Sequence, residues 1–427
     1  MTTASTHRRT ELCERVAGFI HRAGDGPNGE GGEGDRELEQ LALELFAFQF
    51  ETIKPYQRLC RGVGRTPAEV TSWRAIPAVP ALAFKQYSLF AGEPEAIART
   101  FRSSGTTEPG RTSQSAFSRA GLELMDTAVA AAARARLFPD GRRTRILVLT
   151  PPPEQVPHMI MVHGMSHLIA TFGLDGSRFV VGPGGLDFAA LYGELEHCQR
   201  TDVAVSLLGS SFGFVHLFDW MEQGGRRLAL PDGSRLMDAG GYKGRSREIG
   251  RDAFIAWAAK LCGIVRGSVI NLLGMTELAS QIYDWIAPGE PPRAVARMKL
   301  PERWMRTEVV DPRRLGPDGP RPVADGEIGL LRHLDLANVE RPLVIQTEDL
   351  GRRVAANHDD RSKPIGGGTG DKTARGISGP RRGFEILGRA QGAEPRGCSL
   401  SAGDLAAPAR SDASGTELRT ATAGGRS

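Results

Sequence analysis

Hydrophobic and polar positions follow two kinds of pattern along the chain. Apolar residues recur at helical spacing from Leu38 to Gln49, and residues 119–137 are rich in Ala and Leu, so each stretch predicts a helix with one apolar stripe. Short apolar stretches of β-forming residues separate such helices: RILVLT (145–150), RFVVG (178–182), DVAVSLL (202–208) and SVINLL (268–273). Strands that alternate with helices predict an α/β domain with a parallel sheet.

The pattern changes after residue 325, where EIGLLRHL, RPLVIQT and FEILGR follow closely on one another. They predict a smaller β-rich portion over residues 326–405, behind an α/β core over residues 36–325. Glycines concentrated in residues 22–35 predict a linker, and residues 1–35 are expected to form a flexible N-terminal region.

Two further stretches lack apolar periodicity. Residues 361–382 hold six glycines and six basic residues against one acid, and residues 406–427 are mostly Ala, Gly, Ser, Thr and Arg. They are predicted to be a disordered insertion and a disordered tail.

Composition narrows the class of protein. The net charge of +4 arises from 54 basic and 50 acidic residues, which is too small an excess to predict a nucleic-acid surface. The five cysteines (Cys13, Cys60, Cys198, Cys262 and Cys398) are scattered without a CxxC pair, which favours reduced thiols in a cytosol. Because no apolar stretch is long enough to span a bilayer and no secretory pattern opens the chain, we expect a soluble cytoplasmic protein without a transmembrane segment.

The stretch TFRSSGTTEPGRTSQ (100–114) gathers seven Ser and Thr hydroxyls between a predicted strand and a predicted helix. Donors at such close spacing suit an anion with several oxygens, such as a phosphate chain. Ser103, Ser104, Thr106 and Thr107 can donate to phosphates, and Gly105 permits close backbone approach. A Ser/Thr-rich surface loop is the alternative.

Three motifs follow this loop: NLLGMTEL (271–278), QTEDLG (346–351) and LGRAQGAEPRGCSL (387–400). In this order the four elements resemble those of the adenylate-forming enzymes, which activate carboxylic acids with ATP. GGYK (240–243) and RGCSL (396–400) make the resemblance closest to the acyl-protein synthetases, the LuxE family, over roughly residues 40–405. It implies an α/β fold like the N-terminal domain of adenylate-forming enzymes, with parallel sheets flanked by helices and without the mobile C-terminal domain.

The resemblance also implies roles for individual residues. Gly274, Met275 and Thr276 would lie at the nucleotide, with Thr276 at a phosphate, and Glu277 would bind Mg²⁺. Asp349 would accept hydrogen bonds from the ribose hydroxyls, and Arg389 would face the same nucleotide. Each of these residues also has an ordinary structural alternative. Glu277 would be a solvated helix residue, Asp349 a turn cap and Arg389 a member of a surface ion pair.

Two residues are candidates for the chemistry. Lys243 lies in GGYKGR, which is equally consistent with an ordinary surface loop. Cys398 follows Arg396 by two residues, and a nearby guanidinium favours the nucleophilic thiolate. The other four cysteines occupy helical or apolar stretches and are predicted to be core residues. Acyl-protein synthetases, by resemblance, carry the acyl group on a cysteine near the C-terminus; the alternative is that RGCSL packs at the nucleotide edge and another thiol is the acceptor.

The sequence thus predicts ATP-dependent activation of a long-chain fatty acid, with transfer to a cysteine thioester that feeds an acyl reductase. The alternatives are an acid–thiol ligase that forms acyl-coenzyme A and a non-catalytic nucleotide- or acyl-binding relative. The chain departs from the family pattern at Glu108, an acid beside the expected anion site, which is unfavourable unless it points away or meets the metal. Glu348 also stands where glycine is usual.

Overall fold

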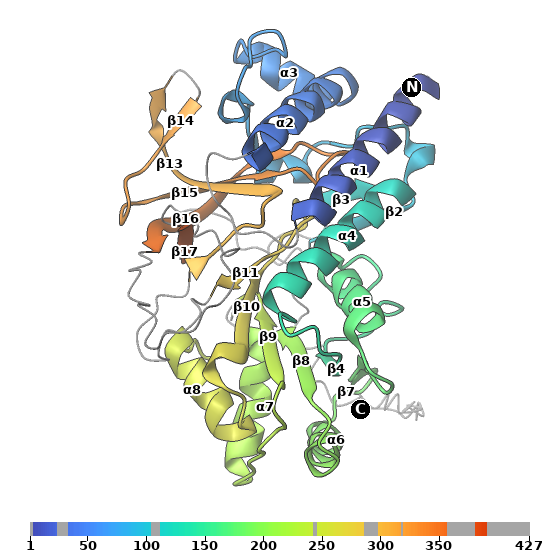
Figure 1. Ribbon diagram of the computed structural model, residues 1–427, viewed down its shortest axis with the longest axis vertical. Coiled ribbons are helices and arrows are strands. Elements are labelled where there is room, and N and C mark those ends of the chain that lie inside the picture. The colour runs from blue at the N-terminus through green and yellow to red at the C-terminus, as the bar shows by residue number, and fades with distance from the viewer. Residues whose placement is uncertain are drawn as a thin grey trace, which may run out of the picture.

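The computed structural model describes residues 3–23, 33–103, 112–241, 246–285, 298–316, 319–356 and 381–390. Its α-helices are α1 (Thr3–Ala23), α2 (Glu33–Thr52), α3 (Lys54–Gly62), α4 (Arg119–Arg136), α5 (Ile160–Phe172), α6 (Phe188–Arg200), α7 (Ser211–Gln223) and α8 (Arg251–Cys262). Its strands are β1 (Val79–Pro80), β2 (Arg99–Arg102), β3 (Gln114–Phe117), β4 (Arg145–Leu149), β5 (Arg178–Phe179), β6 (Val181–Gly182), β7 (Gly185–Leu186), β8 (Val205–Ser210), β9 (Arg235–Ala239), β10 (Val269–Leu273), β11 (Ile282–Trp285), β12 (Met298–Lys299), β13 (Met305–Gly316), β14 (Gly319–Pro322), β15 (Ile328–Asp335), β16 (Val344–Ala356) and β17 (Arg381–Arg389). Figure 1 shows their arrangement.

One large sheet runs through the molecule. Among the described residues it has 13 strands in the order β14-β13-β15-β16-β17-β12-β11-β10-β9-β8-β4-β5, with β1 paired to β16. The β5-β4-β8-β9-β10 half is parallel, whereas the strands from β11 to β14 pair antiparallel. The parallel half lies at one end of the molecule beside α6, α7 and α8, and the antiparallel half lies between it and α2 and α3 (Figure 1).

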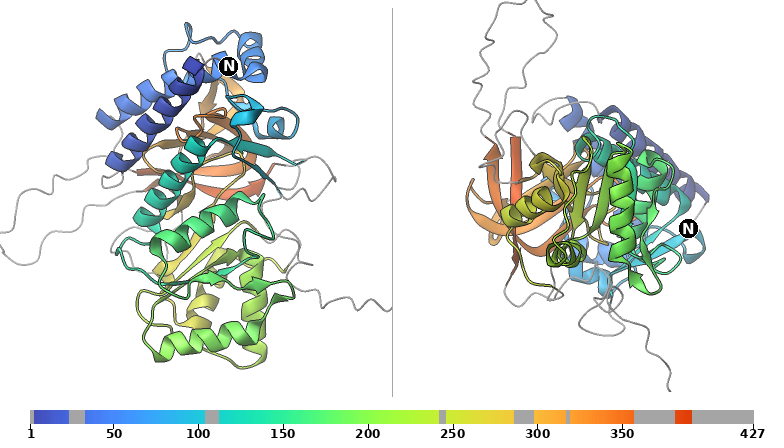
Figure 2. Two further views of the ribbon diagram at one scale, coloured as in Figure 1. Left: turned by 90° about the vertical axis from the view of Figure 1, so that its right-hand side faces the viewer. Right: turned by 90° about the horizontal axis from the view of Figure 1, so that it is seen from below.

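Helices cover both faces of the parallel half. Ile146 and Val148 of β4 belong to a core that includes residues of α4 and α5. The alternating Leu147 and Leu149 belong to a second core with residues of α6, α7 and α8. Strands buried on both faces need apolar residues at nearly every position, which explains the continuous stretches in the sequence. The predicted α/β fold with a parallel sheet flanked by helices is confirmed, and Figure 2 shows the layers from two more directions.

The β-rich portion continues the same sheet. β12 joins the halves, because Lys299 pairs with Asp284 of β11 on one side and with Phe384 of β17 on the other. β13 and β14 precede residue 325 yet belong to the β-rich half, where β13 pairs with both β14 and β15. The boundary expected at residue 325 falls in the turn between β14 and β15, so strands on both sides of it belong to the same sheet.

The N-terminal segment differs from the expected flexible region. Residues 3–23 form α1, in which Leu12, Val16 and Ile20 are buried in the main core. These side chains recur every fourth residue and so form one apolar stripe, which packs toward the core. The glycine-rich linker led to the assignment of the whole region as flexible, although the stretch around Cys13 was expected to be helical. Of the linker itself, residues 33–35 form the first turn of α2, and residues 24–32 lie outside the described residues.

Other boundaries also differ. DVAVSLL becomes a strand only at Val205, because Asp202 has a left-handed φ of 53° and belongs to a turn. RFVVG divides into β5 and β6, and β9 was not predicted. Residues 361–380 of the predicted insertion and the whole tail of residues 406–427 lie outside the described residues.

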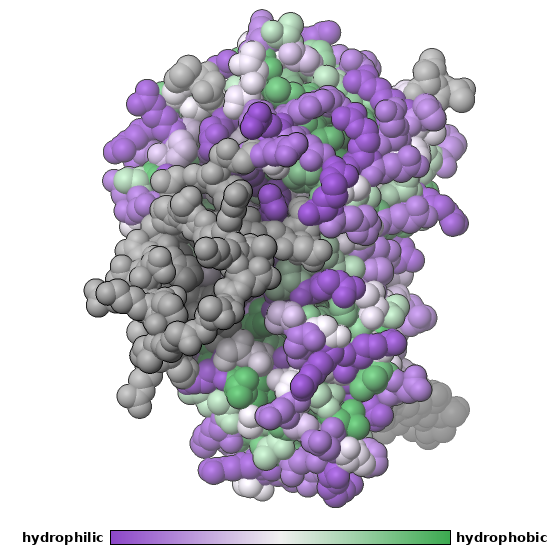
Figure 3. Space-filling model, viewed as in Figure 1, coloured by the Kyte–Doolittle hydropathy of each residue, from purple (hydrophilic) through white to green (hydrophobic). Residues whose placement is uncertain are grey.

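The surface carries the polar residues that the helices turn away from the core. Hydrophilic side chains predominate over the helices on the face shown in Figure 3, and apolar ones are scattered among them. Within the described part of the chain, no helix combines the length and apolar character needed to cross a membrane.

Candidate functional site

The Ser/Thr-rich loop connects β2 and β3, which form an antiparallel hairpin. Ser103 closes the neck of the loop: its N–H donates to the carbonyl of Ser113 at 2.9 Å, and its Oγ accepts from the Ser113 N–H at 3.0 Å. The Arg102 N–H donates to the carbonyl of His158, just before α5, at 2.8 Å. The hairpin is thereby fixed beside the start of α5. The other loop candidates, Ser104, Gly105, Thr106 and Thr107, lie outside the described residues.

The GMTE motif forms an irregular turn directly after β10. Gly274 is exposed, whereas Met275, Thr276 and Glu277 are buried, Glu277 with 6% of its surface exposed. The Glu277 carbonyl accepts a hydrogen bond from Asn338 Nδ2 at 2.9 Å. The backbone that carries the predicted metal ligand is therefore held in place by a side chain 61 residues away.

A small apolar pocket of about 40 Å³ lies beside this turn. Gly274 and Met275 contribute to its wall, as do Gly240 after β9, Met125 of α4 and Gly164 of α5. A volume of this size holds only a few atoms of the size of a water oxygen. The pocket connects the GMTE turn with the helices on that face of the parallel sheet.

Asp349 and Arg389 lie opposite each other on β16 and β17. Arg389 Nε lies 3.5 Å from Asp349 Oδ1, and Arg389 Nη2 donates to Glu348 Oε2 at 2.5 Å. The structure therefore brings the two predicted nucleotide residues together. The guanidinium is shared by two carboxylates, so Glu348, which stands in place of a glycine, has a contact of its own.

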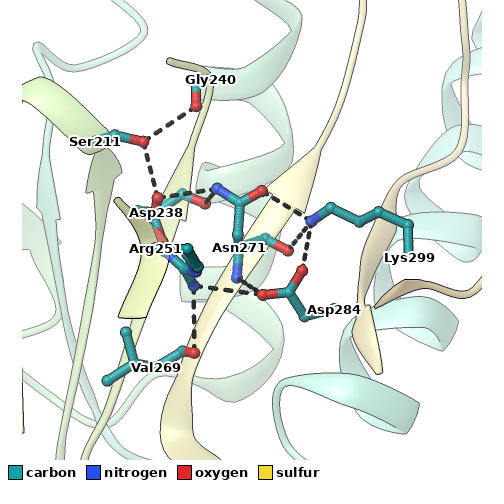
Figure 4. A network of polar contacts seen from close by, with 8 residues as sticks. All are labelled: Ser211, Asp238, Gly240, Arg251, Val269, Asn271, Asp284 and Lys299. Atoms are coloured by element: carbon teal, nitrogen blue, oxygen red, sulfur yellow. Dashed lines mark hydrogen bonds and ion pairs between the residues drawn. The ribbon is translucent and has the colours of Figure 1, made fainter. Parts of the chain in front are cut away.

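A buried polar network, shown in Figure 4, includes side chains of β9 and β10 and of their neighbours. Lys299 Nζ contacts Asp284 Oδ1 at 2.9 Å and donates to the carbonyl and Oδ1 of Asn271 at 2.5 and 2.8 Å. Arg251 Nη1 donates to Asp238 Oδ1 at 2.5 Å, and its Nη2 lies 3.4 Å from Asp284 Oδ2. The network thus places two cations against two carboxylates, and its residues come from four neighbouring strands (β9 to β12) and from the first turn of α8.

The same network reaches the turn after β9. Ser211 Oγ contacts Asp238 Oδ2 at 2.8 Å and the carbonyl of Gly240 at 3.1 Å. Gly240 has a φ of 76°, a left-handed conformation that suits glycine. The network therefore fixes the start of the GGYK stretch, whose Lys243 lies outside the described residues.

The positive charges of Lys299 and Arg251 compensate the negative charges of Asp284 and Asp238. Burial lowers the pKa of Lys299 below its ordinary value, although Asp284 opposes this shift. Burial alone would raise the pKa of Asp284, but Lys299 and Arg251 bring that pKa below its ordinary value. No local pattern in the sequence indicated the network, because its members are single charged residues spread over residues 238–299.

The cysteines that the structure describes are buried: Cys13, Cys60, Cys198 and Cys262. Burial raises the pKa of Cys60 and of Cys262 to about 12 and also raises the pKa of the other two thiols. A buried thiol with a raised pKa is a poor nucleophile. Cys398 lies outside the described residues.

The histidines of α5 serve in contacts between elements. His163 Nε2 lies 2.8 Å from Asp126 Oδ1 on α4, and His163 Nδ1 lies 3.1 Å from Arg99 Nη1 on β2. In the part of the chain that the structure describes, no three His, Cys, Asp or Glu side chains gather as metal ligands.

The chain was compared with models of protein families and with known proteins. A family model described as "Acyl-protein synthetase, LuxE" matches residues 34–405. None of the curated proteins compared with the chain matches it.

Solved structures share the fold at low sequence identity. An open conformation of 2-hydroxyisobutyryl-CoA ligase in complex with 2-HIB-AMP and CoA is 13% identical, with a TM-score of 0.55, over 84% of this chain and 76% of that one. The same ligase in its thioesterification state is 16% identical, with a TM-score of 0.54, over 76% of this chain and 65% of that one. ATP-bound MatB from Rhodopseudomonas palustris is 14% identical, with a TM-score of 0.44, over 71% and 50% of the two chains. The two structures of the first ligase show the shared fold.

Proposed function

This chain belongs to the acyl-protein synthetase (LuxE) family and is a ligase with the adenylate-forming fold, and we propose that it activates a fatty acid with ATP and then transfers the acyl group to a cysteine. The observation that carries the proposal is the placement of the GMTE turn and the neighbouring Gly240 turn around one apolar pocket. At about 40 Å³ the pocket would take only a small apolar part of the acid beside its carboxylate, and the rest of an acyl chain would lie elsewhere.

The first step is adenylation. A carboxylate oxygen of the acid attacks the α-phosphorus of ATP, the bond from that phosphorus to the bridging oxygen breaks, and pyrophosphate leaves. Ser103 and the loop that follows it would hold the phosphates, and Asp349 the ribose hydroxyls. Because no protein bond forms in this step, the chain would act by positioning the reactants and compensating their charge.

Glu277 is the candidate ligand for Mg²⁺. Glu277 lies in the GMTE turn with 6% of its surface exposed, and its carboxylate is the kind of oxygen ligand that this ion takes. Mg²⁺ takes oxygen ligands and commonly binds through one or two carboxylates, substrate phosphates and waters. When bound, the ion would neutralise phosphate charge, and Glu277 would orient it.

The second step transfers the acyl group. A thiolate attacks the carbonyl carbon of the acyl-adenylate, the bond from that carbon to the phosphate oxygen breaks, and AMP leaves. Cys398 is the proposed acceptor, with its thiol proton released to solvent. Support comes from the four other cysteines, which are buried thiols. Lys243 is the second residue proposed to take part in the chemistry. An acyl reductase is the proposed partner that receives the acyl group.

Two rival functions differ from this one in their products. An acid–thiol ligase would pass the acyl group to coenzyme A, and the 2-hydroxyisobutyryl-CoA ligase that shares the fold was solved with both 2-HIB-AMP and CoA. A non-catalytic relative would bind nucleotide or acid without turnover, for example because Glu108 disturbs the phosphate site.

The test measures exchange of labelled pyrophosphate into ATP in the presence of acids from short to long chain. We expect exchange that requires both an acid and Mg²⁺. Lack of exchange with every acid, using folded full-length protein, would overturn the adenylation step. Formation of acyl-coenzyme A in place of labelled protein, when coenzyme A is supplied, would overturn the acceptor while leaving adenylation in place.

A further inference from the structure

The turn that carries Glu277, residues 274–281, contacts Asp335 at the end of β15 and the buried loop of residues 336–341 that follows it. Asp335 is fully buried, and its Oδ2 accepts the N–H groups of Ala279 at 3.1 Å and Ser280 at 2.8 Å. Its Oδ1 accepts the Ser280 hydroxyl at 2.7 Å and the Ala337 N–H at 3.0 Å. Asp335 thus holds the end of the turn with several donors around one carboxylate.

Asn338 holds the beginning of the same turn. Its Nδ2 donates to the carbonyl of Glu277 at 2.9 Å and to that of Pro342 at 3.2 Å. Its Oδ1 accepts the Ala279 N–H at 3.0 Å and Arg341 Nη2 at 2.9 Å. The amide therefore uses both its donors and both acceptor positions, an arrangement that defines one orientation of the side chain.

The loop is itself fixed from a third part of the chain. Gln49 of α2 is fully buried, and its Nε2, which has two hydrogens to donate, lies within hydrogen-bond distance of three carbonyls: Asn338 at 2.6 Å, Val339 at 3.1 Å and Arg341 at 2.5 Å. Its Oε1 accepts the Leu343 N–H at 3.0 Å. An α-helix near the N-terminus thus anchors the loop that holds the GMTE turn.

We propose that Asp335 and Asn338 are positioning residues that set the place of the Glu277 carboxylate for binding the metal ion. This inference rests on the proposed function, in which Glu277 binds Mg²⁺. The turn is neither helix nor strand, so it has no regular ladder to hold it. Substitution of residues that hold a metal ligand in place without contacting the metal commonly lowers metal affinity or activity by roughly 10- to 100-fold.

The test compares Asn338→Asp with Thr144→Val. Asn338→Asp keeps the acceptor for the Ala279 N–H but places a carboxylate oxygen against the Glu277 carbonyl, which removes that hydrogen bond. Thr144 lies fully buried, and its Oγ1 contacts Ser206 Oγ at 2.6 Å in the parallel half of the sheet. Thr144→Val therefore removes one buried side-chain hydrogen bond in a different part of the sheet.

Two readouts separate positioning from stability. Mn²⁺ binding to full-length protein with α,β-methylene ATP, followed by electron paramagnetic resonance, should weaken at least about tenfold in Asn338→Asp and stay at the wild-type value in Thr144→Val. The Mg²⁺ concentration for half-maximal pyrophosphate exchange should rise in parallel. Urea midpoints of both variants show how far each loses stability.

Unchanged Mn²⁺ affinity in folded Asn338→Asp would overturn the positioning role. If that variant does not fold, Asn338→Ser takes its place, because the shorter polar side chain leaves room for a bridging water. The same two readouts then test the positioning role. Wild-type protein that shows no acid-dependent exchange would contradict the proposed function, whereas normal wild-type exchange with unchanged metal affinity in the variants would contradict the positioning alone.

Discussion

Lys299→Met tests whether the buried network of β9, β10 and their neighbours is an essential part of the folded core. The side chain of Lys299 is 5% exposed and that of Asp284 is 4% exposed. Methionine has a similar length but no charge, so the substitution removes the ammonium group with little change in volume. Asp284 and both acceptors on Asn271 then lose their contacts with Nζ.

The expected loss follows from what remains around Asp284. Removing one member of a buried ion pair typically costs about 3–5 kcal/mol, since the other charge stays buried. Here Arg251 Nη2 remains 3.4 Å from Asp284 Oδ2, and the Asn271 N–H still donates to that oxygen at 2.9 Å. We therefore expect a loss near the lower end, about 3 kcal/mol in the free energy of unfolding.

Lys260→Met is the matched control. Lys260 Nζ contacts Glu222 Oε1 at 2.6 Å, but the two side chains are 50% and 40% exposed. An exposed pair of this kind contributes at most about 1 kcal/mol. The same substitution is thus made in a buried and in an exposed ion pair.

The assay is urea unfolding of the full chain at neutral pH, followed by tryptophan fluorescence and circular dichroism. The double variant Lys299→Met/Asp284→Asn should recover at least about 1 kcal/mol relative to Lys299→Met, because it removes the stranded carboxylate. Equal midpoints for Lys299→Met and Lys260→Met, or no recovery in the double variant, would refute the reasoning.

Three further outcomes follow from other parts of the structure. The folded-state pKa of Asp284 lies below its unfolded value of about 3.9. The ionised carboxylate therefore stabilises the fold above that pH, and this contribution is lost as the pH falls through the folded-state pKa. In a plot of urea midpoint against pH, Asp284→Asn should flatten the decline at acid pH, and an unchanged decline would contradict this prediction. Iodoacetamide should modify Cys398 in native protein and spare Cys262, whose pKa burial raises to about 12; peptide mass spectrometry with equal labelling of both would contradict this. Asp349→Ala should raise the KM for ATP about tenfold through lost hydrogen bonds to a charged group, whereas Asp325→Ala, a half-exposed aspartate, should leave it unchanged.

The elements that the sequence predicted well have strong local patterns. RILVLT and SVINLL became β4 and β10, since apolar positions on both faces of a strand leave few other conformations. The order of the parallel strands, with β8 between β4 and β9, could not be read from such stretches. The sequence around Cys13 was expected to be helical, but residues 1–35 as a whole were assigned to a flexible region because of the neighbouring glycines, although Leu12, Val16 and Ile20 form a regular stripe.

The residues of the candidate site also fall into those that local motifs predicted and those that they did not. Motifs indicated Glu277, Asp349 and Arg389, and the structure shows the last two in contact across neighbouring strands. Asp335 and Asn338 gave no signal, because a buried Asp or Asn is recognisable only from its partners, and their partners in the GMTE turn lie 55 to 61 residues away in the sequence. Long-range hydrogen bonds of this kind depend on tertiary structure and leave no local pattern.

The central claim is that one chain both activates an acid and carries the acyl group. The direct measurement is intact-protein and peptide mass spectrometry after incubation of full-length protein with ATP, Mg²⁺ and fatty acid. The account predicts release of AMP together with a mass increase of one acyl group on the peptide that contains Cys398, removed by hydroxylamine and missing in Cys398→Ser. Release of AMP without any acyl adduct on the protein, or an adduct that persists in Cys398→Ser, would contradict it.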